Sequence, residues 1–162
     1  MINANLPALT GDAELDKLKV SLSDVFRSVQ TALDQAQRQT PQIAIVPMIA
    51  ANGGGGAFAW RNPYPRQKLI ITKILLDIRT GSVGGNIDIG TSPSASGTSD
   101  DLIDGLNVTT PGIFTNLTYA GVNGADARFL TADQYITGTI TGDQSLLKAN
   151  CYIEFYFADP VL

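Results

Sequence analysis

The sequence predicts a mainly β protein: an antiparallel, jelly-roll-like β-sandwich preceded by one N-terminal amphipathic helix. About eight segments of roughly 4 to 10 residues carry strand patterns, and turn signals separate them. Only 16% of the 162 residues are charged and 16 are glycine, which is typical of a loop-rich β protein. We therefore expect two parts, an N-terminal arm and helix over residues 1–41 and a β-sandwich domain over residues 42–162.

The one convincing helix is expected over residues 11–39, after a short extended arm. Glycine and proline are absent beyond Gly11. Acidic residues in the first turn and Arg38 in the last turn both suit the helix dipole. Pro41 disfavours helical geometry at the residue before it, so the helix should end there.

The apolar residues of this helix recur at alternating spacings of three and four, an unbroken heptad pattern. The a and d positions are Leu15, Leu18, Leu22, Val25, Val29, Ala32 and Ala36, and Phe26 and Leu33 widen the stripe at e positions. Such a stripe requires a partner, and its width suits three or more chains. We expect a coiled-coil-like homo-oligomer, with a trimer favoured and a pentamer possible. The alternatives are packing along the chain's own sandwich and docking on a different protein.

Residues 68–90 are the most strongly β-patterned part of the chain. Alternation from Leu69 to Ile78 predicts a strand with Ile70, Ile74 and Leu76 on one side. A turn at residues 80–82 then predicts a return strand, so this segment is expected to form a central hairpin.

The remaining strands are expected on both sides of that hairpin. Pro47 places the apolar segment 43–51 at a sheet edge or a bulge. Further strand patterns cover residues 57–60, 106–109, 113–118, 134–141 and 147–157. The glycine run 53–56 is not a phosphate-binding loop, because a strand pattern rather than Gly-Lys-Ser/Thr and a helix follows it.

Composition excludes several classes of function. The chain has no histidine, which removes the commonest general base and the commonest metal ligand. The single cysteine, Cys151, alternates with Ile153 and Phe155 and is interpreted as a buried small hydrophobe. We therefore expect no enzyme, no catalytic residues and no cofactor.

Charge and hydropathy bear on partners and location. The net charge of −4 disfavours a general nucleic-acid binder. No segment approaches the roughly 20 apolar residues of a membrane span, and residues 1–10 lack the features of a signal peptide. We expect a protein that stays in the cytoplasm or assembles there, with no membrane insertion.

Two loops carry weaker candidates for binding. Trp60, Tyr64 and Arg66 could stack on a sugar ring, or the aromatic rings could instead cap the open end of the sandwich. Asp100, Asp101 and Asp104 are a weak calcium candidate, although the ligand alternation of an EF-hand is absent. The plainer interpretation is a solvated loop whose aspartates cap turns.

Four stretches resemble the head-decoration, head-fibre or head-spike proteins of tailed bacteriophages. They are residues 56–63, 70–80, 86–91 and 101–105, with the sequences GAFAWRNP, IITKILLDIRT, NIDIGT and DLIDG. The resemblance implies a β-sandwich module with an oligomerising or capsid-anchoring N-terminal part and no catalytic residues. It implies a virion structural protein that is assembled in the host cytoplasm and contacts the major capsid protein or other virion proteins. The alternative function is a glycan-binding adhesion module that recognises a cell-surface glycan.

Overall fold

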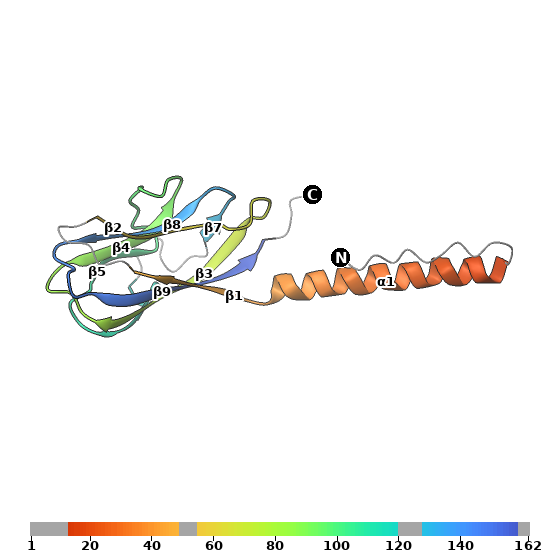
Figure 1. Cartoon of the computed structure of the whole chain (residues 1–162), viewed down its shortest axis with the longest axis horizontal. Coiled ribbons are helices and arrows are strands. Elements are labelled where there is room, and N and C mark those ends of the chain that lie inside the picture. Colours follow the sequence, from red (N-terminus) through yellow and green to blue (C-terminus); the bar gives the residue numbers. More distant parts are fainter. Residues whose placement is uncertain (1–12, 49–54, 120–127, 159–162) are drawn as a thin grey trace. The chain divides into compact units, whose positions relative to one another are not determined.

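The computed structural model describes residues 13–48, 55–119 and 128–158, and the chain divides into two compact units, Met1–Thr40 and Pro41–Leu162. Helix α1 (Ala13–Gln39) belongs to the first unit, and the described strands all belong to the second (Figure 1). The expected N-terminal arm lies outside the described residues, as do Gly53 and Gly54 of the glycine run.

The strands form two antiparallel sheets. They are β1 (Gln42–Pro47), β2 (Gly55–Arg61), β3 (Leu69–Thr80), β4 (Asn86–Ser92), β5 (Ile103–Asn107), β6 (Gly112–Thr115), β7 (Arg128–Leu130), β8 (Tyr135–Thr141) and β9 (Lys148–Phe157). Sheet A has the order β1-β9-β3-β6, with the short β7 also paired to β3. Sheet B has the order β2-β8-β4-β5.

The pairing is nested along the chain. β4 pairs with β5, β3 with β6, β2 with β8 and β1 with β9, so the chain forms one long hairpin. Successive pairs of this hairpin alternate between sheets A and B, and the contacts β3–β9 and β4–β8 join the pairs within each sheet. This is the winding of a jelly roll, and it confirms the predicted fold class of a β-sandwich with one N-terminal helix.

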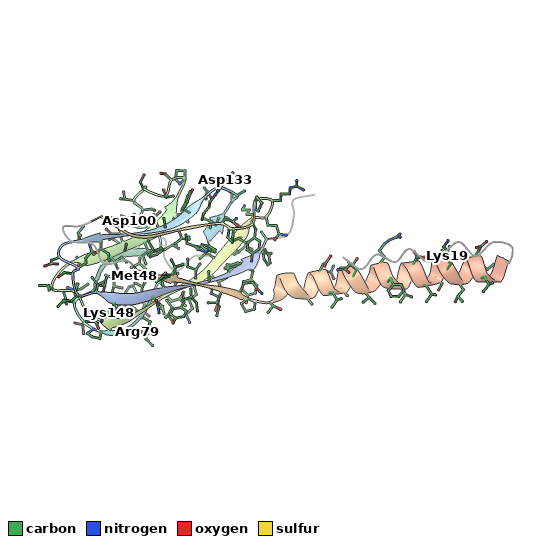
Figure 2. The ribbon with its side chains drawn as sticks, in the orientation of Figure 1. Lys19, Met48, Arg79, Asp100, Asp133 and Lys148 are labelled. Atoms are coloured by element: carbon green, nitrogen blue, oxygen red, sulfur yellow. The ribbon has the colours of Figure 1, made fainter. Side chains whose placement is uncertain are left out.

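The core lies between the two sheets. Its fully buried side chains come from the inner faces of both, and they include Leu69, Ile71, Ile74, Leu76, Ile78, Ile87, Ile89, Ile136, Ile140 and Ile153. Met48, labelled in Figure 2, joins the same core directly after β1. Cys151 is fully buried among these residues, as predicted, and its burial raises the pKa of the thiol.

The predicted central hairpin is wrong. β3 and β4 do not pair with each other: β3 lies in sheet A and β4 in sheet B. The connection between β3 and β4 crosses from one sheet to the other. It passes close to the backbone after β5, since a Cβ at Gly81 would lie 1.9 Å from the Thr109 carbonyl oxygen. Each strand has one apolar face, and facing sheets bury both faces in a shared core. That arrangement also pairs β3 with β9 over almost its whole length.

The alternation predicted for β3 is wrong in its first half. The register with β9 is irregular between Ile71 and Lys73, which leaves Thr72 as an extra residue. The inner face is therefore Leu69 and Ile71 before the irregularity and Ile74 after it, while Ile70 is only half-buried. A β-bulge shifts the inward phase of a strand by one residue, which a strict period of two does not anticipate.

Candidate assembly interface

The apolar stripe of α1 is exposed along the helix taken by itself. The exposed fractions of its large side chains run from 39% for Leu22 to 56% for Val25. All nine predicted positions are classed as exposed: Leu15, Leu18, Leu22, Val25, Phe26, Val29, Ala32, Leu33 and Ala36. A row of large apolar side chains in water is unfavourable, so the helix carries a face that requires a covering surface.

The polar groups of α1 largely satisfy one another. Asp24 and Arg27 form an ion pair with N–O separation of 3.5 Å, and the amide of Gln30 donates to Asp34. The Thr31 hydroxyl donates to the carbonyl of Arg27 one turn earlier. Local pairs of this kind stabilise a helix surface without any partner. The apolar stripe is the part of the helix that needs another molecule or surface.

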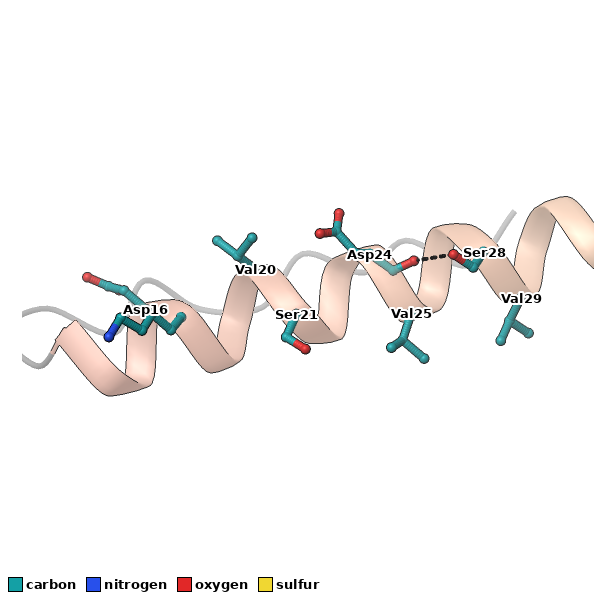
Figure 3. Close-up of a pocket in the computed structure, with 8 residues that line it drawn as sticks. Asp16, Val20, Ser21, Asp24, Val25, Ser28 and Val29 are labelled. Atoms are coloured by element: carbon teal, nitrogen blue, oxygen red, sulfur yellow. Dashed lines mark hydrogen bonds between the residues drawn. The ribbon is translucent and has the colours of Figure 1, made fainter.

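A shallow groove runs along one side of α1 (Figure 3). Its described lining residues are Asp16, Lys17, Val20, Ser21, Asp24, Val25, Ser28 and Val29. Val25 and Val29 project from one side of the helix in this view, while Val20 projects from another. All of these described residues lie on α1, and Val25 and Val29 are the members that belong to the apolar stripe.

The predicted sugar-binding aromatics are packed against the sandwich. Trp60 is half-buried, with its ring centroid 5.6 Å from that of Phe155. Tyr64 is also half-buried and meets Phe157 edge-on at 4.8 Å between ring centroids. Of the three predicted residues only Arg66 is exposed. The two rings therefore contribute to one end of the core, which is the contact that capping of the sandwich requires.

The loop that holds these aromatics is fixed by Asn62. This residue is buried, its amide donates to the carbonyls of Gln67, Leu130 and Thr131, and its oxygen accepts from the backbone of Tyr64. The neighbouring Arg61 forms an ion pair with Asp133. The hydrogen bond that the Arg61 guanidinium donates to Asp133 is the main cause of the raised pKa of Arg61. These contacts fix the conformation of the loop.

The aspartates of the calcium candidate have separate surroundings. Asp101 accepts hydrogen bonds from the Thr91 backbone and hydroxyl and from the Ser99 hydroxyl, at 2.8 to 2.9 Å. Its carboxylate packs over Gly90, where a Cβ would lie 2.1 Å from Oδ1. Asp100 and Asp104 are exposed. Within the residues that the structure describes, no group of three or more His, Cys, Asp or Glu side chains could hold a metal ion.

The structure also shows an exposed apolar surface that sequence analysis missed. The outer face of sheet A carries Ile43 and Ile45 from β1, Leu75 from β3, Tyr152 from β9 and Ile113 from β6, which we call the outer patch. Ile43, Ile45 and Ile113 are 62%, 60% and 69% exposed. The sequence pattern that could have revealed this patch was weak. Both faces of the segment 43–51 are apolar, so its periodicity does not show which side chains point outward.

The described part of the chain contains no helix that is long and apolar enough to cross a bilayer. No protein-family model matches the sequence, and no curated protein matches it either.

Similarity appears at the level of solved structures. A chain in the capsid of Ralstonia phage GP4 is 11% identical, with a TM-score of 0.53; the match covers 74% of this chain and 85% of that chain. A chain in the acidic stable capsid structure of Helicobacter pylori bacteriophage KHP30 is also 11% identical, with a TM-score of 0.48; the match covers 74% of this chain and 89% of that chain. At this identity the likeness to the phage GP4 chain shows a shared fold, which agrees with the jelly-roll winding described above.

Proposed function

We propose that this chain is a structural protein of a tailed-bacteriophage particle. In this proposal several copies, most simply three, are joined through α1. The jelly roll then lies on the capsid or projects from it as a decoration or head-fibre protein. The observation that carries the proposal is the exposed, unbroken stripe of α1 attached to a separate jelly-roll unit. The fold shared with a chain of a phage capsid supports it.

The free energy available from the stripe is sufficient for assembly. Seven large apolar side chains lie on it, and each is already about half-buried on the single helix. Covering the remainder contributes roughly 0.8 to 1.5 kcal/mol for each side chain, or about 5 to 10 kcal/mol per helix and about 10 to 20 kcal/mol for a pair of helices before costs. Association costs an estimated 4 to 15 kcal/mol in lost freedom. Helices that bury the stripe against one another can therefore hold several copies together without help from the sandwich.

The first test compares the solution mass of the full chain with that of a chain starting at Gln42, by light scattering. We expect an oligomer for the full chain and a monomer for the shortened chain. If both proteins were oligomers, the contacts that join the copies would lie in the sandwich. If both were monomers, the result would contradict assembly through α1.

A matched pair of helix variants tests the stripe itself. Leu18→Asp combined with Leu22→Asp places two charges at neighbouring d and a positions and should give a folded monomer. Val20→Asp is the control, because Val20 is 62% exposed but lies at an f position outside the stripe. The control should keep the mass of the unmodified protein. An unchanged mass for the double variant would refute the role of the stripe.

The virion role is tested on particles. Peptides of this chain should appear in mass spectra of phage particles purified on a density gradient, at a constant ratio to the major capsid protein across the particle fractions. A chain found in the lysate but absent from the particle fractions would exclude a virion protein.

A further inference from the structure

The outer patch forms a groove on the exposed side of sheet A. The strand register places Ile45, Tyr152 and Leu75 in one row across β1, β9 and β3. The neighbouring row contains Ile43, Glu154 and Lys73. A hollow of about 310 Å³ is lined by residues of both rows other than Ile45, and by Asp77 and Ile113 beyond them. This apolar surface lies outside the helix stripe described above, and β1 contributes it from a sheet edge.

The charges around the groove are balanced. Asp77 pairs with Arg79 at 3.2 Å, and Glu154 accepts a hydrogen bond from Thr72. Lys73 makes no ion pair with any residue in the described part of the chain. Two acids and one base therefore line the hollow, and Arg79 offsets the charge of one of those acids, so the surface disfavours a strongly charged partner. A face that carries both signs and an apolar centre can instead be complementary to another copy of the same protein.

The chain connection limits the distance between Ile43 and the end of α1. Ile43 follows Gln39, the last helical residue, by four positions, so the two Cα atoms can be no more than about 14 Å apart. Helices in a bundle pack with axes roughly 8 to 10 Å apart. Copies joined through α1 therefore hold their β1 strands at a high effective concentration, on the order of millimolar for a short linker.

We infer that the outer patch is a second interface between copies of this chain, in which the patch packs against the same patch of a neighbouring copy in the oligomer joined by α1. This inference rests on the proposed assembly through α1. The patch comprises five residues, whereas a standard stable interface uses roughly 20 to 30 residues on each side, so the contact depends on the helix to bring the copies together. It gives the oligomer a fixed arrangement of sandwiches, whereas a helix bundle alone would leave them free to swing.

The test uses full-length protein with Ile43→Asp and Ile45→Asp together. Both side chains point outward, so the sandwich should keep its urea unfolding midpoint. Val83→Asp with Leu146→Asp is the matched control, because these residues are 63% and 58% exposed and lie outside the patch. Light scattering over a dilution series should show dissociation of the patch variant at a concentration at least tenfold higher than for the unmodified protein and the control. Equal dissociation concentrations for all three would overturn the inference.

Cross-linking provides a second readout that does not depend on affinity. Cys151 is buried, so a cysteine introduced by Ile45→Cys is the reactive thiol of the folded protein. A short bismaleimide should link copies through Cys at position 45 and should not link Leu146→Cys protein. Oligomers that dissociate normally and show no cross-link at position 45 would overturn the patch contact alone. A full-length protein that is monomeric at every concentration would overturn assembly through α1 as well, so the two failures differ.

Discussion

At the scale of single residues, Gly138 shows how the sandwich uses glycine inside a strand. Gly138 of β8 lies opposite Phe58 of β2, and a Cβ placed on it would come within 2.3 Å of the Phe58 ring. The phenyl ring thus occupies the space that a side chain at position 138 would need. Glycine in a strand interior costs entropy, and here it permits an aromatic ring to pack on the backbone.

Gly138→Ala should therefore destabilise the sandwich by about 1 to 3 kcal/mol, because the Phe58 ring is buried and must move. Gly84→Ala is the control, since nothing lies within 4 Å of the added Cβ at that position. Urea unfolding of both variants measures the difference. Equal stability of the two variants would contradict the packing described here.

Cys151 gives a prediction of pH dependence. Its burial raises the pKa of the thiol above the ordinary 9.0, so the folded protein keeps the proton in a range where the unfolded chain loses it. The stabilisation is fully present below pH 9 and falls as pH rises above it. The slope approaches about 1.4 kcal/mol per pH unit.

The measurement is urea unfolding of the unmodified protein and of Cys151→Ala at pH 8 and pH 10. Other titrating groups are common to both proteins, so the difference between them isolates the thiol. The unmodified protein should lose more stability between the two pH values. Parallel losses would show that the thiol is accessible to solvent in the folded state.

At the scale of elements, Asn116 completes sheet A where its strands leave a gap. β7 pairs with Leu69–Ile71 and β6 with Leu75–Ile78, so Ile74 lies between them. The Asn116 side chain accepts from the Ile74 backbone N–H at 2.8 Å, and its own backbone N–H donates to the Ile74 carbonyl. A residue after the end of β6 thus continues the ladder along β3.

Asn116→Ala should cost about 1 to 3 kcal/mol of stability, because it leaves a buried backbone N–H without a partner. Asn107→Ala is the matched control: its side chain accepts from the Thr109 backbone, but it is exposed, so water can replace the bond. Urea unfolding compares the two variants, and hydrogen exchange at Ile74 locates the effect. A loss no larger than that of the control would contradict this role.

The elements also show which predictions sequence could support. α1 was predicted closely because its period is local and its end is marked by Pro41. β3 was recognised as a strand, but its inner face was not, because the bulge at Thr72 depends on β9. The roles of Trp60 and Tyr64 were open in sequence because an aromatic ring packs on a core or stacks on a ligand by the same chemistry. Their contacts depend on Phe155 and Phe157, which are distant in sequence.

At the scale of the whole molecule, the jelly roll could be predicted as a class but not as a set of pairs. Strand count and turn spacing indicate a sandwich. The pairs β1–β9 and β2–β8 join residues separated by most of the sandwich unit, and no local pattern encodes them. The central hairpin was predicted because neighbours in sequence usually pair, and it was wrong because the connection crosses between sheets.

The position of β9 has a consequence for synthesis on the ribosome. β9 follows every other described strand in the chain, yet it lies between β1 and β3 in sheet A. Until β9 has been synthesised, β3 lacks its longest pairing partner and sheet A is incomplete. The jelly roll can therefore close only after β9 emerges from the ribosome. α1 leaves the ribosome long before that. In the proposed assembly through α1, neighbouring nascent chains on one messenger RNA would therefore join through their helices while their sandwiches are still open.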